Sequence, residues 1–416
     1  MANLIALPEY RGRIADFFLL TFLRDDGNPA EVLATFDGIL KKLHSTRDVN
    51  ILVTFSKDIP TDFEEKFREA VTDKGMNNGR VKLQLMTMLS LCKVIQSALV
   101  ELESISPQTI CNENDLIPRT VFAQDPFSVL EGPGDLNSLL NPIYSYLNFA
   151  NSYMGLCLAD DAEPPSFMVR PTTFLFNGAN TLAGENYVLI GSDSIVLNVE
   201  SHGLSWEKVR DDFQGYYGVD QLVEIGGEKE EFPAFPYCSQ GRFQPVYHLD
   251  MYITLCGPVE NSKGEKEELV LVGQLERVEG TEEVEDPLLE PLLRQIGKSL
   301  DKTAKELNGK KLGARTCRVV RVPLLLDIST GNYFSWNNCL VENFGAEKEK
   351  ILYMPDYVIE EKSEDKLKAC QKKFVETVKQ EGFEVVPIEN DFAYYAMSMR
   401  GSLHCMVKVL RRGEYD

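Results

Sequence analysis

The chain has 416 residues, of which 44% are hydrophobic and 26% are charged. These proportions are typical of a soluble globular protein and exclude a disordered or fibrous chain. The 43 basic and 64 acidic residues give a formal net charge of −21, which argues against nucleic acid as a partner, because phosphate binding requires a concentrated basic surface. A cationic small molecule would suit an acidic surface better, although solubility alone also explains one.

Short apolar segments alternate with longer amphipathic segments along most of the chain, which is typical of an α/β fold. In chain order, strands are predicted at residues 17–23, 49–55, 81–86, 187–190, 221–225, 247–255, 269–272, 317–326, 339–343, 351–354 and 405–410. Apolar residues at helical spacing predict helices at residues 29–44, 62–73, 91–102, 205–216, 289–307 and 363–381. We expect Ser90 and Ser205 to cap two of these helices.

Two acidic stretches, near residues 226–240 and 260–285, are expected to be loops or a hairpin inserted into this scaffold. Neither an internal repeat nor a linker divides the sequence, so residues 1–416 are predicted to form a single domain. The sequence contains no apolar stretch long enough to cross a bilayer, and its start lacks the pattern of a secretion signal. We therefore expect a cytoplasmic protein that does not bind membranes.

The chain's nine cysteines are widely scattered, without a C-x-x-C pair, and it has only four histidines. This pattern fits neither a disulfide framework nor a zinc cluster. We therefore expect no metal ion.

Cys405 follows a turn-like segment and begins a predicted strand, where a loop can expose a thiol at the edge of a sheet. His248 and Asp250 are two residues apart in another predicted strand, so strand alternation would place both side chains on one face. A carboxylate beside an imidazole favours the protonated ring, which can stabilise a thiolate and protonate a leaving group. In an extended chain His404 would point away from Cys405, so we expect it to be a packing or supporting residue.

Two further segments carry polar groups at predicted turns. Asp125 ends an apolar run and precedes Pro126, which places a carboxylate at a strand terminus. Asn177 lies in a segment, residues 174–182, that is predicted to form a β-hairpin with residues 187–191. Taken singly, each of these features is also what ordinary packing residues and turns between strands look like.

In this order, the four segments resemble motifs of the pentein superfamily of guanidino-group-modifying enzymes, which includes the arginine and agmatine deiminases and the glycine amidinotransferases. Phe122-Ala123-Gln124-Asp125-Pro126-Phe127 is similar to the deiminases' F-T-R-D-P-F, and Phe176-Asn177-Gly178-Ala179-Asn180 to the amidinotransferases' F-D-A-A-D. His248-Leu249-Asp250 matches the family's H-[LIV]-D, and Gly401-Ser402-Leu403-His404-Cys405 matches its G-x-x-H-C ending. The tail up to Gly413 and the segment Ser335-Trp336-Asn337-Asn338 are most similar to the amidinotransferases.

The resemblance implies five ββαβ modules arranged as a propeller around a central substrate cavity. It implies that Cys405 attacks a guanidinium carbon and that His248 protonates the departing amine. Asp125 and Asp250 would hold the guanidinium nitrogens, and no cofactor is required. Asn177 stands where the family carries an acid, and its amide can accept a hydrogen bond but supplies no negative charge.

Three functions remain open at this point. The first is a deiminase-like hydrolase that cleaves a C–N bond of a guanidino or amidine compound through a covalent cysteine intermediate. The second is an amidinotransferase that moves the amidino group to an acceptor amine, which the tail favours. The third is a catalytically inactive binding or interaction protein on the same scaffold, which Asn177 favours. The sequence leaves the exact substrate and the oligomeric state open.

Overall fold

The computed structural model describes residues 4–23, 29–43, 48–55, 62–73, 81–87, 123–124, 127–132, 137–142, 167–227, 231–233, 241–277, 287–327, 331–345, 349–357, 364–389 and 401–413. The chain divides into two compact units. The first comprises Met1–Leu4, Ile14–Gly178 and Met406–Arg411, and the second comprises Ile5–Arg13, Ala179–Cys405 and Arg412–Asp416.

The first unit contains a four-stranded sheet in the order β19 (Val407–Gly413), β2 (Arg13–Leu23), β3 (Asp48–Phe55), β4 (Val81–Thr87). β3 runs parallel to both β2 and β4. The helices α1 (Pro29–Leu43) and α2 (Phe63–Asp73) make the connections between these parallel strands, as parallel pairing requires. In the same unit, β5 (Ser128–Glu131) pairs antiparallel with β6 (Asn137–Asn141), which runs parallel to β7 (Phe167–Pro171).

The second unit begins with the predicted hairpin. β8 (Thr181–Gly184) and β9 (Tyr187–Gly191) are antiparallel, and β10 (Gln221–Ile225) runs parallel to β9. Between β9 and β10 lie α6 (Ser192–His202) and α7 (Trp206–Tyr217). Ser205 caps α7 as predicted, because its side chain accepts a hydrogen bond from the Lys208 backbone N–H.

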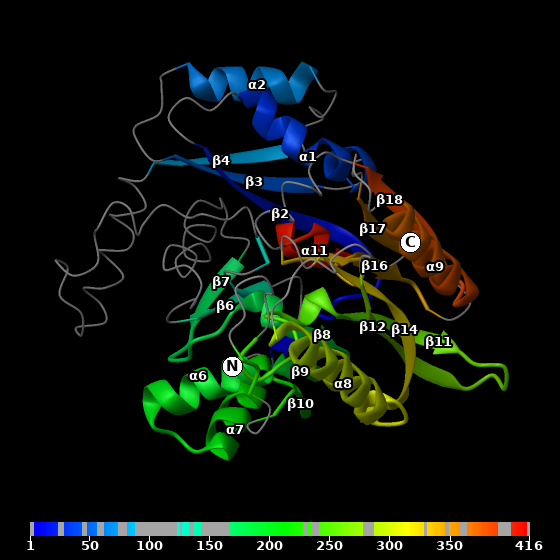
Figure 1. Ribbon diagram of the computed structural model, residues 1–416. Coiled ribbons are helices and arrows are strands. Elements are labelled where there is room, and N and C mark those ends of the chain that lie inside the picture. The colour runs from blue at the N-terminus through cyan, green and yellow to red at the C-terminus, as the bar shows by residue number, and fades with distance from the viewer. Residues whose placement is uncertain are drawn as a thin grey trace. The chain divides into compact units, whose positions relative to one another are not determined.

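The same order of elements recurs twice more in this unit (Figure 1). β11 (Ile253–Glu260) and β12 (Lys266–Arg277) are antiparallel, α8 (Leu289–Leu307) follows, and β14 (Arg315–Asp327) runs parallel to β12. β13 (Lys311–Leu312) and β15 (Asn332–Ser335) pair with β14. β16 (Leu340–Asn343) and β17 (Lys350–Asp356) are antiparallel, α9 (Glu364–Gln380) follows, and β18 (Glu384–Glu389) runs parallel to β17. The predicted α/β class is confirmed. In each of these three sheets, two strands are followed along the chain by one or two helices and then by a further strand.

The structure corrects two predicted strands that carry the candidate site. Residues 247–252 do not extend β11; instead Leu249–Met251 form the 3₁₀ turn η5, and the strand begins at Ile253. Cys405 does not begin a strand, because Leu403–Met406 form the short helix α11 and β19 starts at Val407. Apolar side chains predominate in both segments, and a short run of this kind does not separate a short helix from a strand.

Other differences are smaller. The acidic stretch near residues 260–285 contains β12, which forms a hairpin with β11; β12 also pairs with β14 and is therefore part of a larger sheet. The prediction omitted α6 and β18 among other short elements. The predicted helix at residues 91–102 and its cap Ser90 lie outside the described residues.

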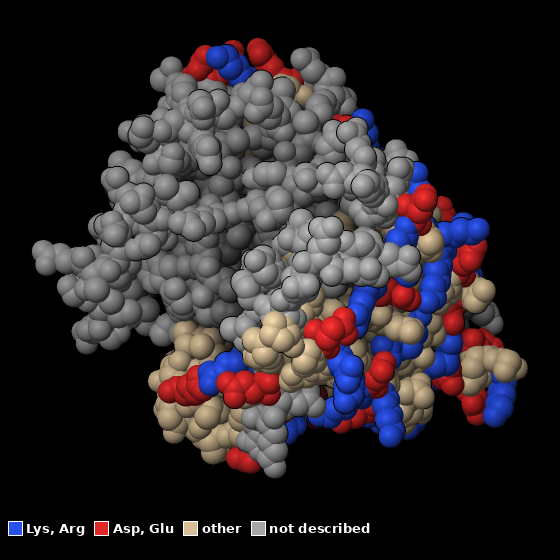
Figure 2. Space-filling view, in the orientation of Figure 1, with Lys and Arg blue, Asp and Glu red and all other residues tan. Residues whose placement is uncertain are grey.

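Among the described residues, no helix is both long and apolar enough to span a membrane. On the face shown in Figure 2, basic and acidic side chains are interleaved over the described surface. Elsewhere in the described chain, ion pairs join Arg277 to Glu290 at 2.5 Å and Arg321 to Asp301 at 2.7 Å.

Candidate active site

Cys405 lies in α11, and only 2% of its surface is exposed. Its thiol donates a hydrogen bond to Oδ2 of Asp250 at 3.3 Å and accepts one from Nδ2 of Asn338 at 3.1 Å. The backbone N–H of Cys405 also donates to Oδ1 of Asn338, at 3.1 Å. Asn338 therefore fixes both the backbone and the sulfur of the candidate nucleophile.

Asp250 lies in η5 and is 1% exposed. Its Oδ2 contacts both the Cys405 thiol and Nδ1 of His404, the latter at 3.0 Å. Its Oδ1 is buried and has no hydrogen-bond partner among the described residues. A buried carboxylate oxygen without a donor is costly, so this atom is well suited to receive an N–H group of a ligand.

His248 precedes η5 with extended backbone angles, and its buried ring packs edge-on against Tyr247 at 5.0 Å between centroids. Burial lowers the pKa of His248 to about 4, although the Asp250 carboxylate opposes this shift. The expected protonated ring is therefore wrong, and His248 is neutral near pH 7. Its predicted acid/base role stays a prediction.

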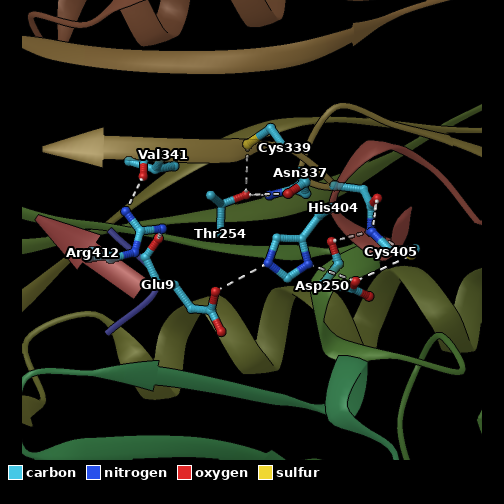
Figure 3. Close-up of polar contacts among 10 residues, drawn as sticks. Glu9, Asp250, Thr254, Asn337, Cys339, Val341, His404, Cys405 and Arg412 are labelled. Carbon is cyan, nitrogen blue, oxygen red and sulfur yellow. Dashed lines mark hydrogen bonds and ion pairs between the residues drawn. The ribbon is translucent and has the colours of Figure 1, made fainter. Parts of the chain in front are cut away.

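His404 was expected to be a packing or supporting residue, because in an extended chain its side chain would point away from Cys405. Residues 403–406 are helical and not extended, so strand alternation does not apply to these two side chains. Its Nδ1 contacts Asp250 Oδ2 at 3.0 Å, and its Nε2 contacts Glu9 Oε2 at 3.3 Å. Burial opposes charge on this ring, yet the hydrogen bonds to Asp250 and Glu9 raise the pKa of His404 to about 9. Figure 3 shows the ring between the two carboxylates.

The segment before Cys405 is anchored by a second set of hydrogen bonds. The hydroxyls of Ser402 and Tyr357 are 2.6 Å apart, and Tyr357 donates to the backbone oxygen of Ser335 at 2.9 Å. The backbone N–H of His404 donates to the backbone oxygen of Asn338 at 3.2 Å. These contacts hold the turn that presents Cys405.

The other two predicted site residues belong to the first unit. Asp125 lies outside the described residues. Asn177 is fully buried directly before the 3₁₀ turn η4 (Gly178–Asn180). A Cβ on Gly178 would lie 2.2 Å from the Gln124 backbone oxygen and 2.6 Å from that of Phe127, so only glycine fits. The two motif segments are therefore in backbone contact, and the substrate-binding roles of Asp125 and Asn177 stay predictions.

Sequence reasoning missed two members of the site. Asn338 belongs to the Ser335–Asn338 segment that resembles the amidinotransferases. The sequence therefore pointed to this segment but assigned no function to Asn338. Glu9 lies in the N-terminal region, which matched the family only in its α/β rhythm, so no sequence signal pointed to it. Among the described residues, no group of three His, Cys, Asp or Glu side chains is placed to hold a metal ion.

Comparison with known proteins supports the fold independently of the motifs. No family model matches the chain, and no curated protein matches it in sequence. Its structure is similar to that of the agmatine deiminase of Enterococcus faecalis, with a TM-score of 0.59, 12% identity, and 99% of this chain and 96% of that chain covered. It is also similar to a substrate-bound agmatine deiminase variant from C. jejuni, with a TM-score of 0.55, 12% identity, and 99% and 97% coverage.

A further protein assigned as an agmatine deiminase gives a TM-score of 0.62 at 13% identity and covers 99% of this chain and 96% of that one. Because these likenesses extend over nearly the whole chain, the chain has the deiminase fold. The resemblance to the pentein superfamily is thus confirmed at the level of the fold.

Proposed function

We propose that the chain is a hydrolase that cleaves a C–N bond of a guanidino or amidine compound through a covalent intermediate at Cys405. The observation that carries this proposal is the contact between the Cys405 thiol and the Asp250 carboxylate, at 3.3 Å. A guanidinium is cationic and planar, so it needs a carboxylate to hold its nitrogens and a nucleophile beside its carbon. Asp250 and Cys405 supply this pair of groups.

In the proposed reaction, the Cys405 sulfur attacks the guanidinium carbon and gives a tetrahedral adduct. His248 takes up the thiol proton and passes it to the departing amine, which leaves an amidino-thioether. Water then attacks the same carbon, His248 accepts its proton, and the C–S bond breaks to release a ureido product and the free thiol. With a pKa of about 4 the ring is neutral at rest and so has a nitrogen open to a proton. It is a weak base, however, so this transfer requires its pKa to rise toward neutrality in the substrate complex.

The carboxylate that binds the substrate also regulates the nucleophile. A carboxylate in contact with a thiol opposes formation of the thiolate, because both groups would be negative. A cationic guanidinium on the buried Oδ1 of Asp250 offsets that charge and makes thiol deprotonation easier. Cys405 would thus become reactive when a substrate is bound.

From the family resemblance we propose that Asp125 and Asn177 bind the substrate. Asn177 offers an amide oxygen to a substrate N–H but no charge, which favours a substrate less cationic than arginine or a slow reaction. We further propose that the five sheets found among the described residues are the five blades of a propeller around the substrate cavity. The described cysteines 256, 317, 339, 370 and 405 form no disulfide with one another, and we also propose a reducing compartment such as the cytoplasm.

The test is a panel of guanidino compounds incubated with the pure protein, with and without acceptor amines. A ureido product with released ammonia supports the hydrolase, and amidine transfer would replace it with the amidinotransferase that the C-terminal tail favours. Cys405→Ala should abolish turnover and the amidino adduct seen by mass spectrometry after acid quenching. Cys370→Ala, at another buried free cysteine, is the matched control, and activity retained in Cys405→Ala would refute the proposed nucleophile.

A further inference from the structure

The ring of His404 lies between two carboxylates, one on each nitrogen. Nδ1 is 3.0 Å from Asp250 Oδ2 and Nε2 is 3.3 Å from Glu9 Oε2. Only an imidazolium can donate a hydrogen bond from both nitrogens. The side chains of His404, Asp250 and Glu9 are 8%, 2% and 19% exposed, so water competes little for these bonds.

Glu9 is itself held in place by two distant parts of the second unit. Its backbone N–H donates to the backbone oxygen of Ala183 in β8, at 2.8 Å. Its backbone oxygen accepts a hydrogen bond from Nη2 of Arg412, whose Nη1 donates to the Val341 backbone oxygen at 2.9 Å (Figure 3). The Glu9 carboxylate is therefore a fixed partner for His404.

The space beside His404 is too small for a substrate. The cavity there measures about 10 Å³ and is lined by Glu9, Asp250, Thr254, Asn337, Cys339 and His404, among others. Such a volume holds about one water molecule. His404, which lies beside this small cavity, therefore acts on a substrate through Asp250 and not by direct contact.

We infer that His404, anchored by Glu9, is a positioning residue that holds the Asp250 carboxylate against the Cys405 thiol. This inference rests on the proposed function and deepens it. Rotation of an aspartate carboxylate about its last torsion is only weakly restricted, so one contact with a thiol does not fix it. The His404 bond to Oδ2 fixes the plane, which leaves Oδ1 available for a guanidinium N–H.

His404 also has an electrostatic effect on the thiol. Among the described residues, the titratable and charged groups near its ring include Glu9, Asp250, Cys405 and Cys339, with Arg412 beyond Glu9. Its positive charge partly offsets the two carboxylates, so it makes a Cys405 thiolate less costly than Asp250 alone would allow. Hydrogen bonds to these carboxylates raise the pKa of His404 to about 9, in agreement with the bonding geometry.

The first experiment needs no substrate. The chain has only four histidines, so NMR of histidine-labelled protein resolves each ring, and a His404→Asn variant assigns the signal. We expect His404 to stay protonated through neutral pH, and Glu9→Gln to lower its titration midpoint by about one pH unit. Glu207→Gln, at an exposed residue of α7, is the control. A midpoint near 6.5 in the wild type, or no change in Glu9→Gln, would overturn the inference.

The second experiment separates geometry from charge. His404→Phe removes both, and we expect kcat/KM to fall by about 100-fold. His404→Asn keeps one N–H donor toward Asp250, so it should restore most turnover. In both variants the pH midpoint of Cys405 alkylation, followed by mass spectrometry of its peptide, should rise, because both lack the charge. Equal loss of turnover in the two folded variants, or unchanged turnover in both, would contradict the assigned role.

The two experiments also separate this inference from the proposed function. If the wild type turns over no guanidino compound while the NMR and alkylation results are as expected, the function fails and the His404 arrangement stands. If turnover is found but Glu9→Gln leaves the His404 titration unchanged, the function stands and the inference fails.

Discussion

His248 and His404 are both buried, and both interact with Asp250, yet the structure gives them opposite charge states at neutral pH. Burial lowers the pKa of His248 to about 4, and the nearby Asp250 carboxylate only partly opposes it. Burial also opposes charge on His404, but its hydrogen bonds to Asp250 and Glu9 raise its pKa to about 9. The difference lies in direct hydrogen bonds to carboxylates, not in the degree of burial.

This comparison suggests how one carboxylate can support two different histidine roles. A neutral His248 can accept a proton, which is what the first step of the proposed reaction requires. A charged His404 cannot accept one, but it can hold Asp250 and offset its charge. The two rings are therefore not interchangeable, and four experiments test the distinction.

The largest expected effect is on turnover. His248→Gln keeps hydrogen-bonding groups but cannot carry a proton, so kcat/KM should fall by at least about 100-fold. The measurement is hydrolysis of the best compound from the guanidino panel, with His202→Gln at an exposed residue as the control. Turnover within about threefold of the wild type would remove His248 as the acid/base.

The next experiment concerns stability at alkaline pH. Below pH 6.5 both the folded and the unfolded His404 ring are protonated, and the ion-pair contribution is fully present. As the pH rises to about 9, the unfolded ring loses its proton first, so about 3 kcal/mol of folding free energy should be lost. Urea unfolding at pH 6 and pH 10 measures this loss of folding free energy, which should be absent in His404→Asn. If that variant loses the same free energy, groups other than His404 are responsible for the loss.

His248 should show the opposite dependence. Above pH 6.5 its ring is neutral in both states. As the pH falls toward 4, the unfolded ring gains a proton that the folded ring does not, which should cost up to about 3 kcal/mol of stability. The difference in unfolding free energy between the wild type and His248→Gln, measured at pH 7 and pH 4.5, isolates this contribution. A difference that does not change with pH would mean that His248 is not held neutral.

Much of the fold could be predicted from the sequence, because long periodic segments determine it. The predicted helix at residues 289–307 coincides with α8, and the strand at residues 221–225 coincides with β10. The motif residues Cys405 and Asp250 were also predicted, and the structure brings them into contact. These features depend on local patterns or on motifs that can be read directly.

The sequence predicted a packing or supporting residue at His404, but its contacts with Asp250 and Glu9 could not be predicted in this way. They depend on whether residues 403–406 are extended or helical, and a segment of four residues carries too little periodicity to decide. They also depend on Glu9, which is 395 positions away in the sequence. A pairing over that separation follows from tertiary structure alone, and the protonation states of His248 and His404 follow from such pairings.

The smallest expected effect tests whether the His404 side of the site can be loosened without changing His248. The Ser402 hydroxyl is 1% exposed and 2.6 Å from that of Tyr357, so Ser402→Ala removes one buried hydrogen bond and should cost about 1 kcal/mol. Tyr357 retains its bond to the Ser335 backbone oxygen, which limits the loss. Ser201→Ala, at an exposed position of α6, serves as the control.

Because Ser402 lies in the segment that carries His404, we expect the NMR titration midpoint of His404 to move in Ser402→Ala while that of His248 stays unchanged. Movement of both midpoints would show that the two rings respond as one unit. In that case the distinction between a proton acceptor and a positioning residue would have to be replaced by a single coupled site.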